Sequence, residues 1–119
     1  MRKILGMVLA GVMVGGFASP AEAQTKYDAY TRVDFFAGDE NPGIHVWVYR
    51  QDSQGDLHGL RYIKVCLQRA SGNSYVNRSC KKTDSGGTVT WLLYSGYEYR
   101  IYVPPTAYHY PSTSESFIA

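Results

Sequence analysis

The chain has 119 residues, 12 basic and 10 acidic side chains, a formal net charge of +2 and two cysteines. This length allows one domain, and a charge so close to neutral gives no basis for binding nucleic acid by charge. Length, charge and composition together exclude a multidomain enzyme, a membrane-spanning protein, a charge-driven nucleic-acid binder and a disordered tail.

The first 23 residues have the anatomy of a secretory signal peptide. Arg2 and Lys3 form a short basic segment, residues 4–17 are almost wholly apolar, and residues 21–23 fit the small-x-small cleavage rule. The apolar run is shorter than the roughly 20 residues that a membrane-spanning helix needs. We therefore expect residues 24–119 to form one domain in the medium, the cell wall or the periplasm, and the compact signal is typical of bacteria.

Beyond this signal the chain alternates between strand and turn patterns. Short runs rich in β-branched and aromatic residues are separated by clusters of Gly, Pro, Asn, Asp and Ser. Residues 38–43 and the polar stretch 51–59 should connect strands, and Pro104 and Pro105 should end one, because proline cannot donate to a β ladder. The expected strands cover residues 31–35, 44–49, 60–68, 75–80, 88–93, 97–103 and a short segment within 112–118.

Seven short strands at this spacing predict an all-β fold, a seven-stranded antiparallel β-sandwich. Successive side chains of a strand point to opposite faces. In the strand 44–49 the aliphatic residues therefore face inward and the ring-bearing residues outward: Ile44, Val46 and Val48 against His45, Trp47 and Tyr49. In the strand 97–103, Tyr97 and Tyr99 should be core or half-buried, and Tyr102 should point outward.

Two cysteines in an oxidising compartment predict one disulfide, Cys66–Cys80. Two free buried thiols are the alternative, and a metal site is weaker because the pair lacks zinc-ligand spacing. If the cysteines face each other in a hairpin, the turn centres on Asn73. That register sets Lys64 opposite Lys82, an unfavourable like-charge pair. We therefore expect the second strand to fray or bulge after Cys80.

Basic residues do not cluster, and their densest group is Arg78, Lys81 and Lys82, beside the predicted disulfide. Lysines on an edge strand are a known device against pairing between sheets. We therefore expect the strand that carries them to lie at a sheet edge.

The stretch from Val65 to Val103 resembles transthyretin-like sandwiches, which include carboxypeptidase regulatory-like domains and the B-type repeats of bacterial surface adhesins. The resemblance rests on a strand at 65–67, a Thr-Asp-x-x-Gly turn at 83–87 and the pattern Leu-x-x-Gly-x-Tyr at 93–99. It implies the same fold, with turn residues and core residues as follows: Asp84 and Gly87 in a turn, Trp91 and Leu93 in the core, and Gly96 in a tight connection. The Tyr-Arg-Gly-Ser terminus of transthyretin-like hydrolases of purine catabolism is missing, so that activity is not expected.

The residues that catalysis would need show no pattern typical of an active site. His45, His58 and His109 are the three histidines, and a metal site would need them to converge. Exposed or locally hydrogen-bonded histidines are the simpler interpretation. No strained nucleophile turn and no defensible carboxylate pair is present. We therefore expect no enzyme and no cofactor, with a metal-dependent enzyme as a third possibility.

The eleven tyrosines are the unusual feature of the composition. Aromatic side chains on an outer face can form a recognition surface and stack on sugar rings. The residues predicted to bind in this way are Trp47, Tyr49, Tyr102 and Tyr108. The alternative is that tyrosine merely replaces aliphatic residues as packing.

These observations favour a small secreted, non-enzymatic binding or structural domain, with a cell-surface glycan or an extracellular protein as its partner. An inhibitor of an extracellular enzyme such as a protease is the alternative, with residues 103–108 as the inhibitory loop.

Overall fold

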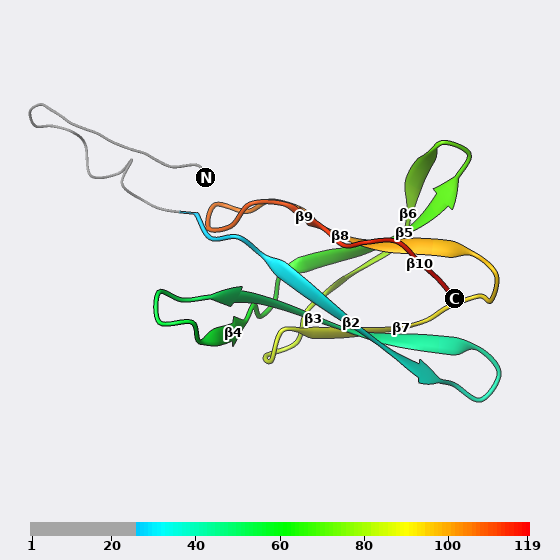
Figure 1. The fold of residues 1–119 in the computed structure, drawn as a ribbon, viewed down its shortest axis with the longest axis horizontal. Coiled ribbons are helices and arrows are strands. Elements are labelled where there is room, and N and C mark those ends of the chain that lie inside the picture. Colours follow the sequence, from blue (N-terminus) through cyan, green and yellow to red (C-terminus); the bar gives the residue numbers. More distant parts are fainter. Residues whose placement is uncertain (1–25) are drawn as a thin grey trace, which may run out of the picture.

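The computed structural model describes residues 26–119, which form an all-β sandwich of two antiparallel sheets (Figure 1). The predicted export signal and its cleavage after Ala23 lie outside the described residues. The strands, labelled as in Figure 1, are β2 (Tyr30–Ala37), β3 (Pro42–Gln51), β4 (Leu57–Gly59), β5 (Lys64–Ser71), β6 (Ser74–Lys82), β7 (Thr88–Leu92), β8 (Glu98–Val103), β9 (Ser112–Thr113) and β10 (Phe117–Ile118).

The described residues thus hold nine strands where the sequence predicts seven. β4 has three residues, and β9 and β10 have two each, so alternation cannot reveal them. β4 lies in the stretch 51–59 expected to be a loop, and the expected terminal strand is divided into β9 and β10. The sandwich architecture itself is confirmed.

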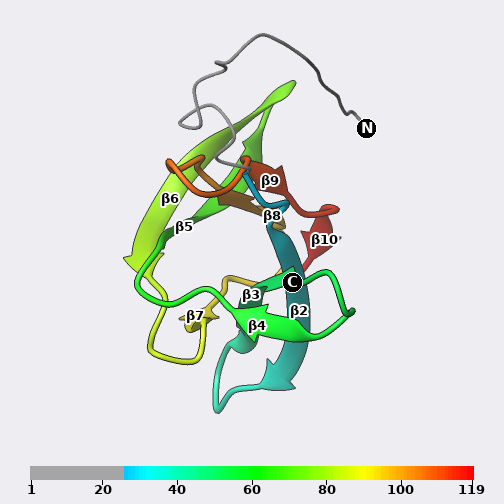
Figure 2. The ribbon, with the colours of Figure 1, turned by 90° about the vertical axis from the view of Figure 1, so that its left-hand side faces the viewer.

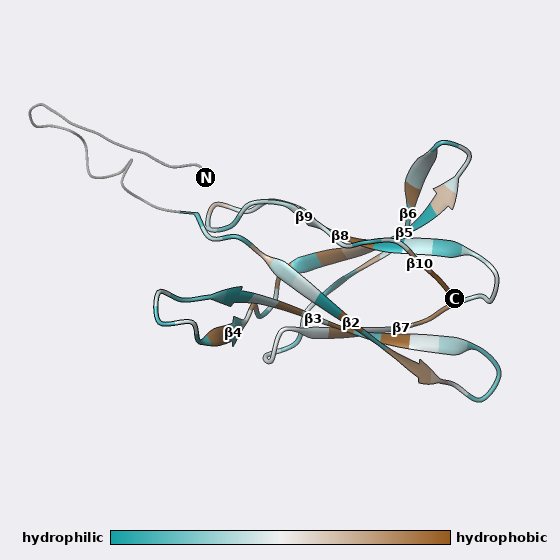
Figure 3. Cartoon of the chain, viewed as in Figure 1, coloured by the Kyte–Doolittle hydropathy of each residue, from teal (hydrophilic) through white to brown (hydrophobic). Residues whose placement is uncertain are grey.

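Each sheet is organised around a central strand. One sheet has the order β2–β3–β4, with β7 also pairing with β3, and the other has the order β10–β8–β5–β6, with β9 pairing with β8. Figure 2 shows β2, β9 and β10 on one side of the sandwich and β6 and β7 on the other. Hydrophobic residues gather on the central strands, and the connections are mostly hydrophilic or neutral (Figure 3).

The core lies between the two sheets and follows the predicted alternation. The residues buried there include Ile44, Val46, Val48, Val65, Leu67, Val89, Trp91, Leu93, Tyr99, Ile101 and Val103. Burying each large aliphatic side chain stabilises the fold by about 1.5–3 kcal/mol. Trp91 and Leu93 are therefore core residues, as expected.

Asp84 and Gly87 form the predicted turn between β6 and β7. The Asp84 carboxylate accepts hydrogen bonds from the backbone N–H of Thr88 and of Gly86, each 2.9 Å long. These bonds, that to Thr88 first, lower the pKa of Asp84 because they favour the charged form. Gly87 has a φ of 89°, a conformation that suits glycine.

The strand predicted from residue 60 begins only at Lys64. Tyr62 has a φ of 59°, which turns the chain before β5. The buried Thr83 holds this turn, because its hydroxyl donates to Leu60 O (2.6 Å) and accepts from Ile63 N–H (3.0 Å). A hydroxyl 20 residues or more away in sequence is a partner that local pattern cannot predict.

The disulfide Cys66–Cys80 is present, with 4.0 Å between the two Cα atoms. β5 and β6 pair in the predicted register from Lys64–Lys82 to Leu67–Ser79. The expectation of fraying or bulging after Cys80 is wrong, since the irregularity lies between Leu67 and Gln68. The like-charged lysines are tolerated because β6 is an edge strand and both side chains are exposed.

Tyr97 also departs from expectation. It is 46% exposed, whereas Tyr99 is 2% exposed. Gly96, with a φ of 88°, redirects the chain just before β8 begins at Glu98, so Tyr97 lies outside the alternating strand. The Arg69 guanidinium lies 4.3 Å from the centre of the Tyr97 ring, a cation–π contact.

Among residues 26–119, no helix has the length and apolar character needed to cross a membrane. The disulfide is consistent with an oxidising compartment.

Candidate functional site

Five ring-bearing side chains form a row on the outer face of the sheet that contains β3. They are Tyr30 and Phe36 of β2, and His45, Trp47 and Tyr49 of β3. The β2–β3 register sets Tyr30 opposite Tyr49 and Phe36 opposite Gly43. We call these five side chains the aromatic row.

Three rings of the aromatic row form a stack. The ring centres of Trp47 and Tyr49 are 4.5 Å apart with 23° between the planes. Those of Tyr49 and Tyr30 are 5.6 Å apart with 29° between the planes. Stacked pairs of this kind contribute about 0.5–1.5 kcal/mol beyond the burial of their area. The stack is therefore a preformed surface with little side-chain freedom left to lose on binding.

Backbone groups lie close to Trp47, in the middle of the row, and hold its indole in place. Trp47 Nε1 donates to Gly86 O at 2.9 Å. A Cβ on Gly59 would lie 2.1 Å from Gly86 O and 3.0 Å from Trp47 Nε1. Glycine at position 59 is thus required for the β6–β7 turn to reach the indole.

The Phe36 end of the row is fixed by a glycine of β3. A Cβ on Gly43 would lie 2.2 Å from Phe36 Cζ, so the Phe36 ring covers this glycine directly. The rings of Phe36 and His45 stack with 4.5 Å between their centres. His45 Nδ1 lies 2.8 Å from Thr90 Oγ1 of β7, which sets the orientation of the imidazole.

The geometry of the stack limits how it can contact a ligand. The Tyr49 ring lies between those of Trp47 and Tyr30 in the stack, so it offers a ligand its edge and its phenol group and not a ring face. A ligand that combines apolar C–H surface with hydroxyl or amide groups fits such a surface, since it can pack against the edges and hydrogen-bond to the phenols.

Of the four residues predicted to bind, the structure brings together Trp47 and Tyr49. Tyr102 lies on the outer face of the other sheet, where it is half-buried and pairs with Cys66 and Thr113. Tyr108 is 64% exposed in the loop after β8. The four residues predicted to form one binding surface therefore lie at three separate places in the fold.

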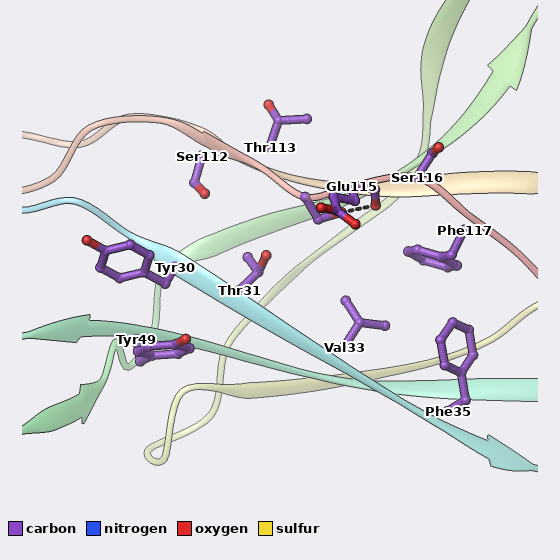
Figure 4. A pocket seen from close by; sticks show the side chains of 11 residues that line it. Tyr30, Thr31, Val33, Phe35, Tyr49, Ser112, Thr113, Glu115, Ser116 and Phe117 are labelled. Atoms are coloured by element: carbon purple, nitrogen blue, oxygen red, sulfur yellow. Dashed lines mark hydrogen bonds between the residues drawn. The ribbon is translucent and has the colours of Figure 1, made fainter.

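A groove of about 480 Å³ begins at Tyr30 and Tyr49 and follows β2 (Figure 4). One wall consists of Thr31, Val33 and Phe35, and the other is the C-terminal segment 112–117. Phe35 meets Phe117 edge to face, with 5.4 Å between ring centres.

The three histidines have separate partners. Besides His45 on Thr90, His58 Nε2 lies 2.8 Å from Asp52 Oδ2, and the buried His109 contacts Tyr110 O through Nδ1 at 3.1 Å. No group of three or more His, Cys, Asp or Glu side chains suited to a metal occurs in the described part of the chain.

Asp52 organises the connection between β3 and β4. Its carboxylate accepts hydrogen bonds from the backbone N–H of Gln54 and of Asp56, both 2.9 Å long, as well as facing His58. The bond with His58, followed by that with Asp56 N–H, lowers the pKa of Asp52. A carboxylate held in its charged form by turn contacts has a structural role.

Sequence reasoning missed Tyr30 as a member of the row. The signal was available: a β2–β3 hairpin that turns at residues 38–41 sets Tyr30 opposite Tyr49. No family model, no curated protein and no solved structure matches this chain. The interpretation of the aromatic row therefore rests on its own chemistry.

Proposed function

We propose that this protein is a non-enzymatic binding domain that acts outside the cytoplasm, and that the aromatic row is its binding surface. The observation that carries this proposal is the stack of Trp47, Tyr49 and Tyr30 on the outer face of a sheet. A rigid aromatic surface offers apolar contact area at low cost in side-chain entropy.

The partner that suits this surface best is a cell-surface glycan. Sugar rings present C–H faces between hydroxyl groups, and the row presents ring edges between the phenols of Tyr30 and Tyr49. The net charge of +2 gives little attraction to a highly charged polymer. An extracellular protein with an exposed apolar surface is the other partner class.

The experiment is a pull-down of the purified, oxidised protein on insoluble polysaccharides and on purified cell wall. Tyr30→Ala and Trp47→Ala should reduce retention, and Trp47→Phe should largely preserve it if the ring matters more than the bond to Gly86. Tyr94→Ala is the matched control, since Tyr94 is 64% exposed and lies away from the row in the β7–β8 connection.

Equal retention of the protein and all variants would show that binding occurs elsewhere. Absence of retention on every polymer would rule out the glycan and direct the search to protein partners. Thermal unfolding of each variant shows that a loss of retention is not a loss of fold.

A second candidate function is inhibition of an extracellular enzyme, and the loop after β8 supports it. Thr106 Oγ1 accepts hydrogen bonds from Tyr108 N–H (3.0 Å) and His109 N–H (3.2 Å). Tyr27 N–H donates to Tyr108 O, and Tyr110 N–H donates to Tyr27 O, each at 2.9 Å. A rigid loop with an exposed tyrosine is the type of segment that can occupy an active site.

Protease assays with a micromolar excess of the protein test this second function. Inhibition should weaken in Tyr108→Ala and in Thr106→Ala, while Trp47→Ala should inhibit like the unmodified protein. No inhibition of any class of extracellular protease would exclude it.

We also propose that the sandwich is transthyretin-like, on the strength of the turn at Asp84–Gly87 and the connection at Gly96. The predicted signal peptide supports secretion. Detection of a mature chain that begins at Gln24 in the medium or the periplasm would test this localisation.

A further inference from the structure

Within residues 26–119, β2 pairs with another strand on one side only, through β3. Val48 N–H donates to Gly87 O, and Leu93 N–H donates to Pro42 O, so the even-numbered residues of β3 direct their backbone groups toward β7 and β4. The odd-numbered residues of β3 therefore bond to β2 through residues 30, 32, 34 and 36.

The backbone groups of Thr31, Val33 and Phe35 consequently point to the free edge. None of them has a backbone partner among residues 26–119. An unpaired row of N–H and C=O groups is a template for another strand.

Two of the other edge strands, β6 and β7, are protected. β6 carries Arg78, Lys81 and Lys82. Lys81 Nζ also donates to Thr90 O at 2.6 Å, which occupies a backbone carbonyl of β7. β2 has no lysine and no proline. The contrast within one fold indicates that the β2 edge is kept available for pairing.

We propose that two copies of this chain associate through antiparallel pairing of β2 with β2 of the partner, centred on Val33. In this register Val33 faces Val33 of the partner subunit, and Thr31 faces Phe35 of the partner subunit. All of these residues direct their backbone groups to the edge. The pairing joins the β2-containing sheets of the two subunits into one continuous sheet with two-fold symmetry.

Charge complementarity selects this register. Arg32 and Asp34 lie on the outer face, with side chains 66% and 55% exposed, and within one chain they form an ion pair with 3.2 Å between Arg32 Nε and Asp34 Oδ2. With Val33 at the centre, Arg32 lies opposite Asp34 of the partner subunit, and the symmetry repeats this pair. Opposite charges in directly facing positions stabilise a sheet.

The neighbouring registers with the same backbone alternation are unfavourable. A shift in one direction sets Arg32 opposite Arg32 of the partner subunit, and a shift in the other sets Asp34 opposite Asp34 of the partner subunit. Both place like charges face to face. Of these three registers, only the one centred on Val33 pairs opposite charges.

The groove along β2 supports the same occupant. Phe35 is 57% exposed there, and the inward-facing side chains of a second β2 strand would extend over the open space beside it (Figure 4). The outer faces of the two sheets lie on the same side, so the dimer would present two aromatic rows together.

The test is sedimentation velocity of the purified protein over a range of concentrations, with charge-reversal variants. We expect a concentration-dependent dimer. Arg32→Asp and Asp34→Arg should each raise the dimer Kd by about tenfold, because each turns two attractive pairs into two repulsive ones. A 1:1 mixture of these two variants should recover the dimer, since Asp at position 32 then faces Arg at position 34. The double variant R32D/D34R should also dimerise.

Arg61→Asp is the matched control, because Arg61 is exposed and lies outside β2. It should dimerise like the unmodified protein. Circular dichroism melts should show every variant folded, since exposed ion pairs add little to stability. A protein that stays monomeric at high concentration would overturn the proposal, as would a dimer unaffected by Arg32→Asp. Failure of the mixed variants to associate would refute the register.

Discussion

Comparing Gly87→Ala with Gly96→Ala separates two reasons why this fold needs a glycine: a positive φ, and close approach of other backbone atoms. Gly87 and Gly96 have almost the same backbone conformation, with φ of 89° and 88°. A Cβ at Gly87 would lie 2.7 Å from Val48 O and 2.8 Å from Leu60 N, whereas a Cβ at Gly96 has nothing within 4 Å. Gly96→Ala therefore measures backbone strain alone, and Gly87→Ala measures strain together with crowding.

The structure sets the expected magnitudes. Positive φ costs an alanine about 1–2 kcal/mol, so Gly96→Ala should lower the free energy of unfolding by that amount. Crowding of a packed site adds about 1–3 kcal/mol, so Gly87→Ala should cost about 2–5 kcal/mol in all. The two crowded atoms, Val48 O and Leu60 N, are also the acceptor and donor of one backbone hydrogen bond, 2.8 Å long.

Urea unfolding followed by tryptophan fluorescence measures both variants under one condition. The difference between them is the cost of close approach. Equal losses would refute the conclusion that the β6–β7 turn must lie against β3. A larger loss of unfolding free energy for Gly96→Ala than for Gly87→Ala would refute the whole explanation, in which Gly96 has strain alone and Gly87 has strain and crowding.

Three other changes test the remaining parts of the fold. Reduction of the Cys66–Cys80 disulfide, with a sequence separation of 14, should lower the free energy of unfolding by about 3 kcal/mol through the entropy of the unfolded chain; an unchanged urea midpoint would contradict this. Val46→Ala, at a site 0% exposed, should cost about 2–3 kcal/mol, with the exposed Val76→Ala as a nearly neutral control. The lowered pKa of Asp84 means that its contribution to stability is complete above its ordinary pKa of 3.8 and is lost as the pH falls through the lower folded value. Melting temperatures should therefore fall in acid, less steeply for Asp84→Asn than for the unmodified protein, and equal slopes would exclude this role.

The two proposals about interaction are independent in their tests. Binding through the aromatic row is tested at Trp47 of β3, away from the β2 edge, and association through β2 is tested at Arg32 and Asp34. A dimer that binds no polymer would support the association through β2 and contradict the glycan partner. A monomer that binds a polymer would do the reverse. If both hold, each dimer carries two rows, and retention on a polymer should then exceed that of Arg32→Asp because both rows can engage at once.

Local pattern was sufficient wherever a property depends on neighbours along the chain. The alternation of Ile44, Val46 and Val48 with His45, Trp47 and Tyr49 predicts which face of β3 is buried, because successive side chains of a strand point to opposite faces. The turn at Asp84–Gly87 follows from side-chain hydrogen bonding to nearby N–H groups and from the positive φ that glycine adopts. The Cys66–Cys80 bond follows from the presence of two cysteines.

Strand pairing determined how side chains of different strands come together in the candidate site. The register of β2 against β3 brings Tyr30 onto Tyr49, and the assignment of β8 to the second sheet carries Tyr102 to the opposite outer face. Neither follows from alternation, which gives the face that a residue shares with its own strand but not the strand beside it. The free edge of β2 has the same origin, because whether a strand is central or at an edge depends on which strands pair with it, and only the folded chain settles those contacts.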